Sequence, residues 1–189
     1  MTFTLSISAL QASGACAREC ILLKQAFPNG TIVFDMSEYS KVSERGVNVI
    51  WATPLLPIQG QKELALAWYD RATNGQSPAW KGDLRALITT PNADVGATQL
   101  TARLDERRAA SPDDELATAL AGVGYAAASF AIKYAEVPLD KARLQSAMAV
   151  LAQWCARAAA AIETTTAESV MADFQRDTYA KLAQYGATL

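Results

Sequence analysis

The longest stretch without a charged side chain runs from Leu116 to Ile132, and it constrains the fold more than any other feature of the chain. Alanine, glycine and serine dominate this stretch. A helix that is apolar on every side is normally surrounded by protein. We therefore predict a helix over residues 111–135 that lies at the centre of the fold.

The residues at the start of this predicted helix suit a helix N-terminus. Ser111 suits the N-cap position and Pro112 suits the first turn. Three acidic residues then suit the positive end of the helix dipole: Asp113, Asp114 and Glu115. Farther along, small residues allow neighbouring backbones to approach closely: Ala117, Ala121, Gly124 and Ala128. The pair of glycines at 122 and 124 lacks the remaining parts of a dinucleotide-binding motif, so we interpret it as a helix-packing feature.

The uncharged run is too short and too rich in alanine for a membrane span. A span needs about 20 strongly apolar residues, and alanine contributes little to insertion. The N-terminus has no basic segment followed by an apolar one, so no secretory signal is expected. We predict a cytoplasmic protein that does not bind membranes.

The rest of the C-terminal half reads as long helices. Residues 97–110 predict a surface helix, because Leu100 and Leu104 share one face of an otherwise polar segment. Residues 138–162 predict a second long helix whose apolar seam has alternating four-and-three spacing: Leu144, Met148, Leu151, Cys155, Ala158 and Ile162. Residues 167–185 predict a last helix. The short connection after residue 135 favours an antiparallel pair, and we expect an antiparallel three-helix bundle over residues 97–189.

The N-terminal half predicts shorter elements. Helices are expected over residues 15–27, 38–44, 61–72 and 80–88, with a partly helical apolar segment at 47–56. Residues 2–7 suit a short strand or an extended arm, and residues 31–34 are β-branched, which leaves one short strand pair open. The fold class is therefore mainly α. The turn-rich residues 89–96 are the best boundary between a small module at 1–90 and the bundle, although one continuous domain is an alternative.

Charge and composition disfavour several classes of function. The net charge is −2 and the basic residues are scattered, so little is available to neutralise nucleic-acid phosphates. The chain has no histidine, which removes the usual general base and the commonest metal ligand. Its three cysteines, an odd and low number, fit a reducing cytoplasm. We predict no direct nucleic-acid binding and no cofactor.

The cysteines do not predict a metal site or a nucleophile. Cys16 and Cys20 are one helical turn apart, but a closed zinc site needs four ligands and Cys155 is the one other cysteine. With no histidine to activate a thiol, we interpret all three as packing residues.

Two groups of residues are candidates for a partner-binding surface. Tyr39, Trp51 and Trp68 would form an exposed apolar patch on the first half of the chain. Arg103, Arg107 and Arg108 would contact an acidic partner. The competing interpretations are core packing for the tryptophans and a solvated helix face for the arginines.

Residues 7–56 carry an ordered series of motifs. The series is Gly14-Ala15-Cys16, Phe27-Pro28-Asn29-Gly30, a β-branched run from Thr31, and a segment from Val47 to Leu56 that contains Trp51. This part resembles a small module, without an assigned function, of phage, prophage and related bacterial proteins. It departs from that pattern at Pro54. The alanine-rich part after Leu56 is similar to helical proteins encoded near secretion-system genes, mainly in composition and in Val137-Pro138.

These observations lead to one preferred function and three alternatives. The resemblance implies a phage or mobile-element accessory protein, and no catalytic constellation is evident. We therefore predict a non-enzymatic protein that binds a host or phage-encoded protein, such as an inhibitor of a host system. The alternatives are a virion or assembly component, a homo-oligomeric scaffold, and a small helical enzyme that uses the carboxylates of Asp113, Asp114 or Glu115.

Overall fold

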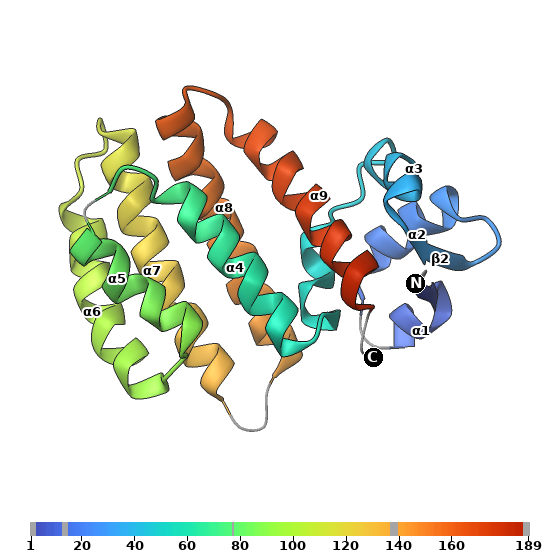
Figure 1. Ribbon diagram of the computed structural model, residues 1–189, viewed down its shortest axis with the longest axis horizontal. Helices are drawn as coiled ribbons and strands as arrows, with labels where there is room; N and C mark the ends of the chain where they lie inside the picture. The colour runs from blue at the N-terminus through green and yellow to red at the C-terminus, as the bar shows by residue number, and fades with distance from the viewer. Residues whose placement is uncertain (1–2, 13–14, 77, 137–139, 187–189) are drawn as a thin grey trace. The chain divides into compact units, whose positions relative to one another are not determined.

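Helices make up most of the chain in the computed structural model, which describes residues 3–12, 15–76, 78–136 and 140–186, with residues 78–81 described by their backbone alone. The fold is mainly α, as predicted. The elements in chain order are β1 (Phe3–Ser6), α1 (Ile7–Ala12), α2 (Ala17–Ala26), β2 (Thr31–Phe34), η1 (Met36–Glu38), α3 (Tyr39–Ser43), η2 (Val49–Leu55), α4 (Ile58–Ala72), α5 (Pro78–Thr89), α6 (Ala93–Ala109), α7 (Glu115–Ala135), α8 (Lys141–Glu163) and α9 (Ala167–Tyr185) (Figure 1).

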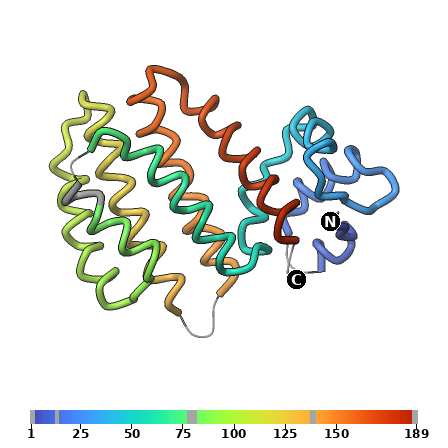
Figure 2. Tube along the Cα trace, viewed as in Figure 1, coloured from blue at the N-terminus to red at the C-terminus, as the bar shows by residue number. Residues whose placement is uncertain are grey.

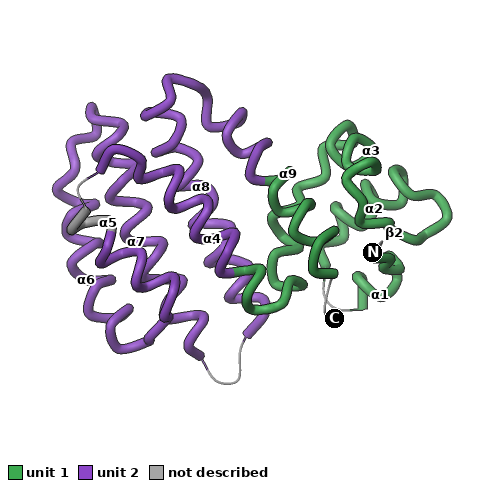
Figure 3. The backbone as a smooth tube through the Cα atoms, in the orientation of Figure 1, with its two compact units in different colours: residues 1–61, 175–189 green, residues 62–174 purple. Residues whose placement is uncertain are grey.

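The chain forms two compact units, one of which combines two segments that are distant in sequence (Figure 3). One unit contains residues 1–61 and 175–189, and the other contains residues 62–174. The division therefore falls inside α4 and α9, whereas the sequence placed its boundary at residues 89–96.

The first unit is built on a two-stranded antiparallel sheet. β1 pairs with β2 in a register that joins Phe3 to Phe34 and Ser6 to Thr31, so the strand alternative predicted for residues 2–7 is the one observed. The Tyr179 hydroxyl of α9 donates a 2.7 Å hydrogen bond to the carbonyl oxygen of Val33. This bond satisfies a β2 carbonyl and ties the end of the chain to the sheet.

The apolar segment at 47–56 is less helical than expected. Val49–Leu55 forms a 3-10 helix that has Pro54 in its interior. Proline lacks the backbone N–H that an α-helix interior uses, and it clashes with the preceding turn. Most side chains of this segment are nevertheless buried: Val49, Ile50, Ala52, Thr53, Pro54, Leu55 and Leu56.

In the second unit, α7 packs against α6, α8 and α5 (Figure 2). It is buried along much of its length, at Ala119, Ala121, Gly122, Val123, Gly124, Ala126, Ala127, Ala128, Phe130 and Ala131. Among the described residues, α7 is also the one helix long and apolar enough to cross a membrane, and 56% of its most apolar window is buried in the protein.

Two predicted helix starts are wrong by several residues. α7 begins at Glu115, because Asp114 rather than Ser111 is the N-cap and its carboxylate accepts a 2.9 Å hydrogen bond from the Ala117 N–H. α6 begins at Ala93, where the Asn92 side chain accepts from two backbone N–H groups. Much of the turn-rich segment 89–96 is therefore the capped first turn of a helix rather than a linker.

The predicted seam of the next helix is confirmed with one exception. Leu144, Met148, Leu151, Cys155 and Ala158 are buried, and Ile162 is half-buried. α8 begins at Lys141 with Asp140 as its N-cap. The earlier residues 138 and 139, predicted as its start, lie outside the described residues.

Candidate functional site

One face of α7 carries the polar side chains of its uncharged run, which is otherwise apolar. Thr118, Tyr125 and Ser129 recur at spacings of seven and four residues, and Lys133 continues the same face. All four side chains are half-buried. The expectation that this helix is enclosed on every side is therefore wrong along this face.

This face of α7 and the adjoining face of α8 enclose an open groove of about 260 Å³. We call it the α7–α8 groove, and it is lined by Tyr125, Ser129, Lys133, Arg143, Ser146, Ala147 and Val150. Lys133 of α7 and Arg143 of α8 line one end of the groove. The middle is made of hydroxyl groups and small apolar side chains, a mixture that suits a peptide segment.

The cations at this end of the groove are balanced by carboxylates. Lys133 Nζ lies 2.7 Å from Glu136 Oε1, and Arg143 lies 3.6 Å from the same oxygen. Arg143 also contacts Asp140 at 3.4 Å. Two positive and two negative charges therefore meet here, and this end of the groove is close to neutral.

Beyond Tyr125 and Val150, which line the groove, the same faces of α7 and α8 continue to Gly122 and Trp154. The Trp154 indole packs directly on Gly122, where a Cβ atom would stand only 2.2 Å from the ring. Two guanidinium groups accompany the indole: the Cζ of Arg107 is 4.9 Å, and that of Arg157 is 5.0 Å, from the ring centroid. The Arg107 Cζ is also 5.5 Å from the Tyr125 ring centroid. We call Arg107, Tyr125, Trp154 and Arg157 the arginine–tryptophan cluster.

The charges of this cluster are not paired with any carboxylate of the residues that the structure describes. Arg107 and Arg157 are both exposed, and neither has an ion-pair partner among the described residues. A cation–π contact is worth about 0.5–1 kcal/mol at an exposed site, and it leaves the charge in place. Two positive charges therefore share one aromatic ring on the surface of a chain whose net charge is −2.

The other two predicted arginines have local roles. The Arg103 side chain is only 14% exposed, and its guanidinium bonds Glu106 and Gln99 on its own helix. Arg108 is exposed and lies 3.6 Å from Asp105. Of the three predicted arginines, Arg107 is thus the one that the structure brings to an aromatic cluster.

The predicted aromatic patch is not assembled as an exposed surface. Trp68 is fully buried and stacks on Phe174 with 5.4 Å between ring centroids, so the prediction that it is exposed is wrong. Tyr39 is half-buried, with its ring 5.3 Å from that of Tyr179. Trp51 is also half-buried, and its indole nitrogen is shielded from solvent. These side chains serve packing within their own units.

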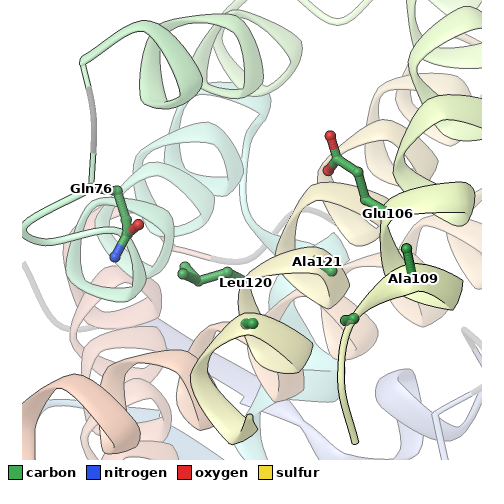
Figure 4. A pocket seen from close by; sticks show the side chains of 7 residues that line it. Gln76, Glu106, Ala109, Leu120 and Ala121 are labelled. Carbon is green, nitrogen blue, oxygen red and sulfur yellow. The ribbon is translucent and has the colours of Figure 1, made fainter.

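A second, larger groove of about 500 Å³ opens between α6 and the start of α7 (Figure 4). Figure 4 shows Gln76 and Glu106 on opposite sides of a floor made of Leu120 and alanine methyl groups. Its lining residues are Gln76, Glu106, Ala109, Ala110, Ala117, Leu120 and Ala121. The Glu106 carboxylate is engaged by Arg103 at 2.5 Å. This groove therefore offers apolar contact area and one carboxylate that is already paired.

The carboxylates of the enzyme alternative lie at the start of α7. Asp113, Asp114 and Glu115 are all exposed, and Asp114 is occupied as the N-cap. Within the described ranges, no group of three or more His, Cys, Asp and Glu side chains is placed to hold a metal ion. These carboxylates are in contact with solvent, whereas the acid–base residues of enzymes commonly lie in a desolvated cleft.

The three cysteines have different environments. Cys16 is exposed at the N-cap of α2, whereas Cys20 and Cys155 are buried. Burial raises the pKa of the Cys20 thiol and that of the Cys155 thiol, because a buried thiolate loses its hydration. The two buried thiols are therefore protonated at neutral pH and act as small apolar groups.

In comparisons with known proteins, the chain matches no family model, no curated protein and no solved structure. The resemblance of residues 7–56 to a phage module therefore stays a prediction, and the candidate site rests on its own geometry.

Proposed function

We propose that this chain is a non-enzymatic protein that binds another protein through the arginine–tryptophan cluster and the adjoining α7–α8 groove. The observation that carries the proposal is the pair of uncompensated guanidinium groups, Arg107 and Arg157, on the half-buried indole of Trp154. Tryptophan, tyrosine and arginine are the residues most enriched where binding energy concentrates in protein interfaces. All three types meet in this cluster.

The cluster is also prepared for binding before a partner arrives. The indole packs against the backbone of Gly122, and the Arg107 guanidinium lies over both Tyr125 and Trp154. Side chains that are already positioned lose less conformational entropy on association, so more of the contact energy appears as affinity.

The biological setting that we propose is a phage or mobile-element accessory protein of the cytoplasm, such as an inhibitor of a host system. The support for this setting is the resemblance of residues 7–56 to phage and prophage modules. A virion or assembly component, a homo-oligomeric scaffold and a carboxylate-dependent enzyme are the competing functions.

The experiment compares three forms of the tagged protein in an affinity capture from host lysate, analysed by mass spectrometry. They are the unmodified chain, the variant Arg107→Ala/Arg157→Ala, and the control variant Arg45→Ala/Arg176→Ala. The control also removes two exposed arginines that have no ion pair among the described residues. Melting temperatures verify that all three forms are folded.

We expect one stoichiometric protein that is captured by the unmodified chain and by the control but lost from the cluster variant. Equal capture by all three forms would overturn the assignment of the surface. Light scattering measures the oligomeric state of the purified chain. If the chain forms a defined oligomer and captures no other protein, the proposal is wrong and a structural role takes its place.

A further inference from the structure

We infer that the partner presents an acidic segment whose carboxylates reach Arg107 and Arg157, while uncharged small side chains of the same segment lie along the α7–α8 groove. This inference rests on the proposed function and adds the chemistry of the partner. The distribution of charge and apolar surface along the groove supports it.

The two ends of the groove differ in charge. Next to the end lined by Tyr125 and Val150, in the arginine–tryptophan cluster, two guanidinium groups lack carboxylate partners within the described part of the chain. At the other end, Glu136 and Asp140 balance Lys133 and Arg143. A segment with carboxylates at one end is therefore favoured in a single orientation, with its acidic end at Trp154.

Between these ends, none of the described residues that line the groove carries a full charge. Ser129 and Ser146 supply hydroxyl groups, and Ala147 and Val150 supply apolar contact. A charged side chain placed here would lose hydration without gaining a partner. The middle of the groove therefore selects small uncharged side chains such as alanine and serine.

The length of the bound segment follows from helix geometry. Arg157 and Arg143 are separated by fourteen positions of α8, which corresponds to about 21 Å at 1.5 Å per residue. A segment that covers the groove therefore needs about fourteen residues if it is helical, and about six if it is extended.

Planar guanidinium groups favour carboxylates as the anionic partner. A guanidinium donates two parallel hydrogen bonds to one carboxylate, a geometry that an ammonium group does not offer. A contact with an aromatic ring uses none of these N–H donors as a conventional hydrogen bond, so both arginines keep donors for a carboxylate.

The test uses defined peptides and the purified full chain. The probe is a fluorescently labelled peptide of about fourteen residues, with a run of glutamates at one end and alanine and serine in the remainder. One comparison peptide has every glutamate replaced by glutamine, and a second has the same composition with the glutamates distributed evenly. Fluorescence anisotropy measures the affinities at low and at high salt.

We expect the end-charged peptide to bind at least about tenfold more tightly than the glutamine peptide, and to weaken as salt rises. The evenly charged peptide should bind less tightly than the end-charged one. Arg107→Ala/Arg157→Ala should lose this preference, and Arg45→Ala/Arg176→Ala should keep it. A charge-reversed variant, Arg107→Glu/Arg157→Glu, should reject the glutamate peptide and bind its lysine counterpart.

Equal affinity for the glutamate and glutamine peptides would overturn the inference. Unchanged binding of the glutamate peptide by the folded charge-reversed variant would also overturn it. A third overturning result would be that the unmodified chain dimerises and the cluster variant does not, because the cluster would then contact a second copy of the chain. If a captured protein depends on Arg107 and Arg157 but the peptides show no charge preference, the inference fails while the proposed function stands.

Discussion

The indole of Trp154 packs directly against the backbone of Gly122. A Cβ atom built on this glycine would lie 2.2 Å from Cδ2 and from Cε3 of the ring, far inside van der Waals contact. The absence of a side chain on α7 therefore permits α8 to place a large aromatic side chain against it. Both guanidinium groups of the candidate site lie over this ring.

Replacement of Gly122 by alanine is expected to displace the indole and to lower stability. Overpacking a tight contact costs about 1–3 kcal/mol, which exceeds the gain of about 1 kcal/mol that alanine brings to a helix interior. Urea unfolding measures the change. Gly82→Ala is the matched control, because Gly82 is an exposed helical glycine and a Cβ atom added there would meet nothing within 4 Å. Equal stability of the two variants would show that Trp154 does not rest on residue 122.

Gly124 has a different neighbour, so it gives a separate prediction. A Cβ at this position would stand 2.8 Å from Cδ of Arg103, and leucine would force that side chain away from Glu106 and Gln99. We expect Gly124→Leu to destabilise the protein by about 1–3 kcal/mol. An unchanged melting temperature would mean that this part of α7 is not buried.

A double-mutant cycle tests the stated cause of that loss. Arg103→Ala removes the side chain that the new leucine would strike, so the combined variant Gly124→Leu/Arg103→Ala should recover part of the stability. Additive losses would place the clash elsewhere.

Hydrophobic periodicity predicted the helices well, because the apolar residues that recur with helical spacing are also the residues that are buried. The seam from Leu144 to Ala158 was readable since each of its residues is apolar and lies on one side of α8. Helix starts were less predictable, because Ser111 and Asp114 are both good N-caps and the sequence alone does not rank them. The pairing of β1 with β2 was left open because both segments have only four residues.

The candidate site was only half predictable. Arg107 was singled out, but Trp154 and Arg157 were not, because they become neighbours of Arg107 only when α6 and α8 pack on α7. One signal was available in the sequence. The polar positions Thr118, Tyr125 and Ser129 recur with helical spacing inside the uncharged run, which marks the face of α7 that opens to the groove.

Arg71 links three helices and gives a pH-dependent prediction. Its guanidinium bonds Glu163 through two hydrogen bonds of 2.7 and 2.8 Å, and it bonds Asp173 at 2.9 Å. The hydrogen bonds from Arg71 to Glu163 hold the pKa of the Glu163 carboxyl below its ordinary value. A lowered carboxylate pKa stabilises the folded state above the ordinary pKa of glutamate, and this contribution is lost as the pH falls through the lowered value.

We therefore expect Glu163→Gln to reduce stability at pH 7 by about 1 kcal/mol, because the group is partly exposed and solvent screens the pair. The difference from the unmodified chain should shrink as the solution becomes more acidic than about pH 4. Thermal unfolding from neutral to acidic pH measures it. Glu168→Gln, at an exposed position of α9, is the control, and an identical pH profile for both variants would contradict the prediction.

The hydrogen bond between the Tyr179 hydroxyl and the carbonyl oxygen of Val33 gives the last prediction. Tyr179 is 1% exposed, and burial raises its pKa to about 12. Tyr179→Phe leaves the Val33 carbonyl without this donor, so we expect a loss of about 1 kcal/mol in the free energy of unfolding near neutral pH.

The raised pKa of Tyr179 also predicts a pH dependence. The protonated tyrosine stabilises the fold below about pH 10, the ordinary tyrosine pKa in the unfolded chain, and this contribution disappears as the pH rises toward 12. The phenylalanine variant should therefore lose less stability between about pH 9 and pH 11 than the unmodified chain, as measured by urea unfolding at each pH. Parallel losses in both proteins would show that Tyr179 does not titrate as a buried group.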